Sequence, residues 1–202
     1  MTSATSPAAT SWDAAYAAGR YAGEPPVSFT RDILAAARKA MVTSGLYRHY
    51  AGKDELAAAA LRFRDKTHLD WLLPEDDGDG RQRVRAMFDR IARAATSAHF
   101  RGCPFLRASL ELPAGHPAQG AVAEHRHRLH ARLCLLAARL GAREPDALAR
   151  QLMVLADGAA SGCAVQRSPA PARDARELAL VAIVAATAET QAVQTQDVET
   201  DK

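Results

Sequence analysis

The sequence has few aromatic residues, few cysteines and no long apolar run, and each shortage excludes a class of protein. Aromatic residues make up 5% of the chain against 48% hydrophobic residues, and this alanine- and leucine-rich composition favours an all-α protein. Three cysteines lie far apart without a CxxC pair, which indicates reduced thiols in a cytoplasmic protein. No apolar run reaches the ~18 residues of a membrane span, and the opening MTSATSPAATSW lacks the basic and apolar regions of a signal peptide.

Catalytic motifs are missing as well. The sequence contains no GxSxG, no HExxH and no P-loop. The GDG at residues 78–80 lies in an acidic loop and does not follow a strand. The net charge of +3 is weakly basic and does not by itself indicate nucleic-acid binding. We therefore predict that the protein is not an enzyme and has no resident cofactor.

Helical periodicity is what the sequence does contain. Apolar residues recur at three- and four-residue steps between glycine and proline breakers, which predicts helices over 81–99, 118–141, 145–166 and 172–190. Another long helix starts at AGKDEL, and a short helix lies within 101–117. No strand pattern is present. We expect residues 1–10 to be a disordered tail and residues 191–202 to be a flexible tail.

The last helix, over 172–190, differs from the others because it is apolar on two sides. Leu178 and Val181 lie on one side, and Ile183 lies on the other. Such a helix has to be covered on both sides. Helix 145–166 carries the small residues DGAASG, which allow another helix to approach closely. We therefore predict a homodimer formed through these two helices, which contribute four helices in total.

The stretch SGLYRHYAGKDEL, residues 44–56, resembles the recognition-helix end and fourth-helix start of the TetR family of bacterial transcription regulators. RGCPFLRASLELPAGHPAQGAVAEHRHRLHARL resembles a pattern in the ligand-binding body of that family, and DALARQLMVLADGAA resembles its dimer-forming helix. The resemblance implies an all-α, TetR-like helical bundle. In it, residues 44–56 are the remnant of a helix-turn-helix head, and residues 57–190 form the ligand-binding and dimerisation domain.

The residues before Ser44 depart from the family pattern. The step from Val42 to Tyr47 is one residue shorter than in the family, and Met41 stands where the family has glycine. WDAAYAAGRYAGEPPVSFTRDILAAARKAMVTSGLY instead resembles the start of a class I S-adenosylmethionine-dependent methyltransferase, although the glycine-rich cofactor loop does not follow. We hypothesise a chimera, in which an atypical segment over 11–43 leaves the helix-turn-helix head incomplete or abnormal.

The TetR resemblance places four residues where family members contact the DNA backbone, namely Tyr47, His49, Tyr50 and Lys53. Hydroxyl, imidazole and ammonium groups at a helix end can hold phosphates and so position the protein without reading bases. The small residues before Tyr47 offer little for direct base readout. The alternative is that the aromatic residues are core of a degraded head and the charges are solvated.

The resemblance also implies a pocket for a small, mostly apolar effector, whose binding alters the spacing of the two heads. The residues that we expect to line this pocket are Trp71, Phe88, Phe100, Cys103 and Phe105. The alternative for the aromatic residues is ordinary core packing. Cys103, in the sequence GCPF, is expected to pack as a small apolar residue rather than to act as a reactive thiol.

Three potential metal ligands, His127, His130 and Cys134, share one side of helix 118–141. Imidazole and thiolate groups bind soft divalent metals. Arginines on the same helix would repel such an ion, so we interpret the three residues as a polar flank and predict no metal site.

Together these features predict a TetR-like, ligand-responsive transcription regulator, with repression as the expected activity. The alternative is a sensor-only homodimer, or a gene remnant, that lacks specific DNA binding. The two differ in whether residues 11–56 form a folded three-helix head.

Overall fold

The computed structural model of the protein describes residues 52–75 and 78–199, with side chains over the same ranges apart from Lys53 and 189–199. Over these ranges the structure is helical and has no strand, which confirms the predicted all-α class. The described helices are α3 (Lys53–Leu72), α4 (Gly80–Ala94), α5 (Pro104–Glu111), α6 (Ala118–Arg139), α7 (Pro145–Gln166) and α8 (Ala170–Glu199). The predicted tail 1–10 and the methyltransferase-like segment 11–43 lie outside the described residues, as does the proposed chimeric junction.

The helix boundaries follow from local signals in the sequence. α4 begins after Asp79, whose side-chain oxygens accept hydrogen bonds of 3.2 Å from the backbone N–H groups of Arg81 and Gln82, so the carboxylate caps the helix. α7 begins at Pro145. Proline lacks a backbone N–H, but at the first position of a helix this group has no partner within the helix, so no hydrogen bond is lost. α6 ends just before Gly141, which has a positive φ of 76° and reverses the chain. These start and stop signals determine where the helices that carry the apolar stripes begin and end.

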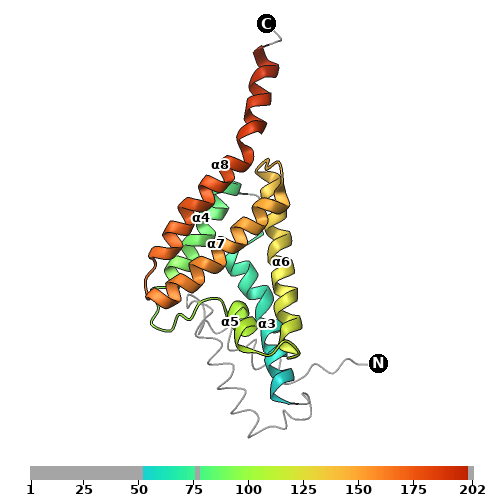
Figure 1. Ribbon diagram of the computed structural model, residues 1–202, viewed down its shortest axis with the longest axis vertical. Helices are drawn as coiled ribbons and strands as arrows, with labels where there is room; N and C mark the ends of the chain where they lie inside the picture. The colour runs from blue at the N-terminus through green and yellow to red at the C-terminus, as the bar shows by residue number, and fades with distance from the viewer. Residues whose placement is uncertain (1–51, 76–77, 200–202) are drawn as a thin grey trace, which may run out of the picture.

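The helices pack around one core in which α7 and α8 lie side by side, as do α3 and α6 (Figure 1). α4 packs against α8 and α7, while α5 lies against α6. The predicted stripes on α4 and α6 are buried in this core, except that Leu140 is only partly covered. The buried members are Val84, Phe88, Ile91, Ala95, Val122, Leu129, Leu133 and Leu136.

As the sequence predicted, Ile183 lies on a different side of α8 from Leu178 and Val181. Ala179 and Ile183 are fully buried against the chain's own core, whereas Leu178, Val181 and Val184 are exposed. One side therefore belongs to the bundle of a single chain, and the other remains uncovered in that chain.

The glycines of DGAASG have different surroundings. A Cβ added at Gly162 would lie 2.9 Å from Cβ of Pro171, so this glycine permits the close turn between α7 and α8 of the same chain. A Cβ at Gly158 would meet no atom of the described residues within 4 Å. Only part of this small-residue segment is therefore free to receive a second subunit.

Two predicted helix ends differ from the structure. α4 ends at Ala94 rather than residue 99, because turns formed by hydrogen bonds from Thr96 and Ser97 replace the helix there. α8 continues to Glu199, through most of the predicted flexible tail. The sequence from 189 to 199 contains alanine, glutamine and glutamate with no glycine or proline, so nothing in it stops the helix.

No helix in the described ranges is both long enough and apolar enough to cross a membrane.

Candidate functional site

A small cavity of about 40 Å³ lies between α3, α6, α7 and the segment that leads into α5. Its lining combines aromatic rings with histidine, cysteine and charged side chains. Those that matter below are His68, Trp71, Phe100, Cys103, Phe105 and His125. A cavity of this size holds an ion or a few waters, whereas drug-sized ligands occupy about 300–1,000 Å³.

The loop before α5 reaches this cavity because of a glycine. Gly102 has a positive φ of 78°, which a residue with a side chain rarely adopts. A Cβ at this position would lie 3.3 Å from the carbonyl oxygen of Ala160 on α7. Gly102 therefore lets the loop lie against α7 and brings Cys103 into the lining.

A buried acid–imidazole pair connects α3 to α6 beside the cavity. Oδ1 of Asp65 lies 2.6 Å from Nδ1 of His125, and both side chains are almost fully buried. Arg128 forms an ion pair with the other oxygen of the same carboxylate. Because Nδ1 of His125 donates to Asp65, the lone pair of this imidazole is on Nε2.

Aromatic contacts fix the two histidines of the cavity. The ring of His125 stacks on Phe105 with centroids 3.6 Å apart and planes inclined by 8°. The ring of His68 lies between Trp71, Phe105 and His125, at centroid distances of 5.6, 5.5 and 5.4 Å.

Burial lowers the pKa of His68 well below its usual value of 6.5, and the neighbouring His125 and Arg64 lower it further. Burial also lowers the pKa of His125, against the opposing effect of Asp65, so both rings are neutral at neutral pH.

Cys103 and Arg64 influence each other at the edge of this cluster. Burial raises the pKa of the Cys103 thiol, while backbone hydrogen bonds and the positive charge of Arg64 lower it. Burial lowers the pKa of the Arg64 guanidinium to about 10. At neutral pH the cysteine is therefore a thiol beside a charged arginine.

Four of the five residues predicted to line an effector pocket meet at this cavity: Trp71, Phe100, Cys103 and Phe105. Phe88, the fifth, lies fully buried in the core and is not in the lining. The sequence could not separate Phe88 from the lining residues, because Ile91 on the same stripe of α4 does line the cavity.

Phe88→Ala is expected to lower the free energy of unfolding by about 3–5 kcal/mol, because it removes a fully buried ring and leaves a void. Urea denaturation at fixed protein concentration measures the change. The control is Leu135→Ala on the exposed side of α6, where a change within about 0.5 kcal/mol is expected. Equal effects of the two substitutions would contradict the core position of Phe88.

The polar flank of α6 is arranged differently from the sequence prediction. His130 and Cys134 lie beside each other, with the cysteine sulfur 3.7 Å from the imidazole nitrogens, and Nε2 of His130 is 3.1 Å from Oδ1 of Asp146. Asp146 comes from α7, and its other oxygen pairs with Arg150. His127 is exposed and does not join this group. The group is a partly exposed cluster of polar side chains in which ligand atoms of His130, Cys134 and Asp146 lie within 4.8 Å of one another. The absence of a metal here stays a prediction.

His68, Asp65 and His125 were not predicted as site residues, although the sequence contains a signal for one of them. His125 lies three residues after Val122 and four before Leu129, so it occupies the apolar stripe of α6. A histidine within a buried stripe indicates a buried polar partner. Nothing in the sequence identified that partner as Asp65, which is 60 residues away.

Three of the residues predicted to bind DNA, Tyr47, His49 and Tyr50, lie outside the described residues. The fourth, Lys53, is the first residue of α3, and its side chain is not described.

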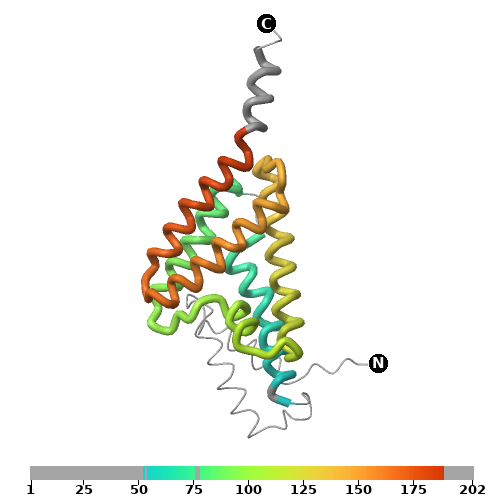
Figure 2. The backbone as a smooth tube through the Cα atoms, viewed as in Figure 1, coloured from blue at the N-terminus to red at the C-terminus, as the bar shows by residue number. Residues whose placement is uncertain are grey.

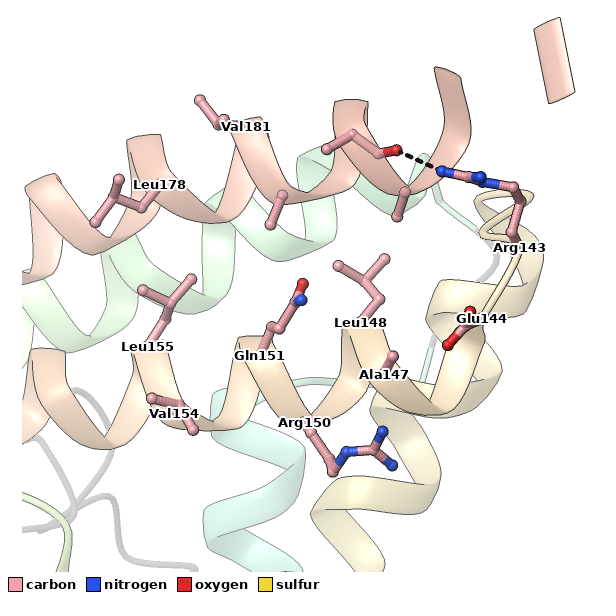
Figure 3. A pocket seen from close by; sticks show the side chains of 13 residues that line it. Arg143, Glu144, Ala147, Leu148, Arg150, Gln151, Val154, Leu155, Leu178 and Val181 are labelled. Carbon is pink, nitrogen blue, oxygen red and sulfur yellow. Dashed lines mark hydrogen bonds between the residues drawn. The ribbon is translucent and has the colours of Figure 1, made fainter. Parts of the chain in front are cut away.

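A second concavity lies on the outside of the molecule, along α7 and α8. It is an open groove of about 860 Å³, lined at its apolar centre by Val154, Leu155, Leu178 and Val181. Leu148 and Leu155 point from α7 toward α8, while Arg150 points away from it (Figure 3). Figure 2 shows the backbones of α7 and α8, which supply the residues that line this groove, lying beside each other.

Comparison with known proteins finds similarity in structure. No protein-family model and no curated protein sequence matches the chain. SAV143, a Streptomyces avermitilis protein assigned to the TetR transcriptional regulators, is 29% identical, with a TM-score of 0.60 over 68% of this chain and 80% of that one. SCO4454, a TetR-family transcriptional regulator from Streptomyces coelicolor, is 25% identical, with a TM-score of 0.61 over 72% of this chain and 78% of that one.

A third structure, the reduced form of NemR from Escherichia coli, shares the fold at 18% identity. Its TM-score is 0.59 over 68% of this chain and 77% of NemR. The structural neighbours that are described by function are transcriptional regulators, not enzymes. The resemblance predicted from the sequence is confirmed: the body of this chain has the all-α fold of the TetR family of transcriptional regulators.

Proposed function

We propose that the protein is a cytoplasmic transcription regulator that binds DNA as a homodimer and changes its DNA affinity when an effector occupies the cavity. The observation that carries this proposal is the position of α3. The helix begins at Lys53, the last of the four residues predicted to contact DNA, and its later turns supply His68, Trp71 and Leu72 to the cavity lining. In this proposal the single helix α3 couples the cavity to the DNA-binding segment.

Polar contacts hold α3 to α6 along much of its length. Near its start, Asp54 lies 3.3 Å from His116, which precedes the first residue of α6 by two positions. Asp65 pairs with His125 in the middle, and Asp70 pairs with Arg132 at 2.8 Å near the end. An effector that enters between α3 and α6 has to displace side chains on both helices. Its differential affinity for two positions of α3 would then supply the coupling to DNA.

The homodimer is part of the proposal because the body leaves an apolar surface on α7 and α8. Val154, Leu178, Val181 and Val184 are each at least half exposed in the single chain. A twofold interface brings the same patch of both subunits together. Four helices packed in this way cover the outer side of α8 and set the distance between the two DNA-binding segments.

Lys53→Ala is expected to weaken DNA binding regardless of sequence and to make the affinity less dependent on salt. Each lost lysine–phosphate contact reduces the log–log salt slope by about one, so a dimer loses about two. Fluorescence anisotropy of a labelled duplex over a salt series measures the slope. Lys66→Ala, which removes the same charge from an exposed position further along α3, is the matched control and should leave the slope unchanged.

Identical slopes for wild type and Lys53→Ala would contradict the phosphate contact. If the wild-type protein also failed to bind any duplex, the sensor-only dimer would be the better account.

A further inference from the structure

Three side chains that commonly bind transition metals converge on the cavity from separate elements. His68 comes from α3, Cys103 immediately precedes α5, and His125 comes from α6. One ligand atom of each lies within 4.8 Å of the other two. The potential metal ligands that the sequence pattern indicated, His127, His130 and Cys134, include none of these three residues.

His125 is already oriented as a metal ligand. The carboxylate of Asp65 holds Nδ1 at 2.6 Å, so Nε2 keeps its lone pair. Metal-binding histidines almost always donate their other N–H to a carboxylate or carbonyl, which fixes the tautomer and raises ligand basicity. Phe105 stacks on the same ring and restricts its rotation.

His68 provides a second, independent observation. Its side chain is 6% exposed, and its Nδ1 is buried without a hydrogen-bond partner among the described residues. A buried polar atom that makes no hydrogen bond costs about 1–3 kcal/mol. If the ring rearranges so that this nitrogen donates its lone pair to a cation, the cost of the unpaired buried atom is removed.

The dimensions of the cavity suit an ion better than an organic effector. Zinc bonds of about 2.0–2.3 Å place tetrahedral ligand atoms about 3.3–3.6 Å apart, so the three groups need to approach by about 1.5 Å at most. The cavity of about 40 Å³ leaves room for the ion and a water in a fourth position.

The surrounding charges are compatible with a cation once the thiol loses its proton. Arg126 pairs with Asp157 at 2.9 Å, and Arg128 pairs with Asp65. Burial raises the pKa of the Cys103 thiol, and the positive charge of Arg64 opposes this effect. Once a metal ion has displaced the thiol proton, the thiolate reduces the repulsion between Arg64 and the ion. Binding therefore releases one proton from the thiol.

We propose that His68, Cys103 and His125 form a binding site for one thiophilic transition-metal cation, such as Zn²⁺, with Asp65 as the positioning residue for His125. Thiolate and imidazole ligands favour zinc and copper(I) over magnesium and calcium. The proposal deepens the proposed function, because it names a metal cation as the effector class, and only this regulatory consequence rests on that function.

The test uses Co²⁺ as a spectroscopic probe on the full-length, reduced protein after treatment with a chelator. The expected result is one Co²⁺ per chain, with a cobalt–thiolate charge-transfer band that Zn²⁺ abolishes by displacement. Cys103→Ser should lose the band. Cys134→Ser, which removes the thiol of the surface group on α6, should keep it with unchanged affinity.

Two further variants keep the test decisive if Cys103→Ser loses its helical circular dichroism. His68→Gln should weaken Co²⁺ binding at least tenfold without removing the thiolate. Asp65→Asn should weaken it about 10–100-fold, as expected for loss of a carboxylate that orients a ligand, while the shape of the band is retained.

Absence of a thiolate band from the wild type would overturn the proposal. So would a band that survives in Cys103→Ser, one that disappears in Cys134→Ser, or unchanged affinity in His68→Gln. The absorption measurement contains no DNA, so its failure leaves the proposed regulator intact, and failure of DNA binding leaves the metal site intact.

Discussion

Val181→Glu is expected to convert the homodimer into a monomer and to raise the dissociation constant at least about a thousandfold. Val181 is 64% exposed on α8 in a single chain, so the fold of that chain tolerates the substitution. In the proposed dimer the same position is covered, and burial of an unpaired carboxylate costs several kcal/mol. Twofold symmetry introduces the change twice, and each 1.4 kcal/mol corresponds to about a tenfold change in affinity.

Light scattering coupled to size-exclusion chromatography measures the mass, and circular dichroism confirms that the variant remains helical. Leu110→Glu is the matched control, because Leu110 is 78% exposed but lies on α5, away from the groove. The control should keep the mass of the wild type. A dimeric Val181→Glu protein would show that the outer side of α8 is not the interface.

Asp65→Ala is expected to lower the free energy of unfolding by about 3 kcal/mol, one of the largest losses available from a single polar side chain. Asp65 is only 4% exposed and is the common partner of His125 and Arg128. Its removal leaves Nδ1 of His125 buried without its acceptor. The contact between α3 and α6 loses its central polar pair at the same time.

Urea denaturation of the metal-free protein measures this loss. Asp70→Ala removes a carboxylate that is 46% exposed on the same helix and pairs with Arg132, and such a surface pair contributes about 1 kcal/mol or less. Asp65→Asn keeps one acceptor for His125 and should fall between the two. If Asp65→Ala were no more destabilising than Asp70→Ala, the buried pair would not connect the helices as described.

The helices themselves could be predicted because their signals are local. The stripe from Val122 to Leu136 is enough to identify α6, and Pro145 marks the start of α7. The two-sided character of α8 was also readable, because a period of 3.6 residues separates Leu178 and Val181 from Ile183. These predictions require no knowledge of how the helices pack.

The cavity was only partly predictable because it depends on the relative position of separate helices. Trp71, Phe100 and Phe105 could be proposed as lining residues from the family resemblance. The alignment of Asp65 with His125 depends on the register of α3 against α6, and periodicity along one helix carries no information about that register. The same limit explains why Phe88 was predicted to line the cavity. Its buried stripe on α4 was predicted correctly, but the sequence does not show which helices pack against that stripe.

The measurement that tests the central claim most directly is the affinity of the wild-type protein for two labelled duplexes, by fluorescence anisotropy at physiological salt. One duplex carries the sequence upstream of its own gene, and the other carries the same bases in scrambled order. A regulator should prefer the natural duplex by about a thousandfold or more, and Val181→Glu should lose this preference with the dimer. Equal affinities for the two duplexes, falling together as salt rises, would contradict the account and favour the sensor-only dimer.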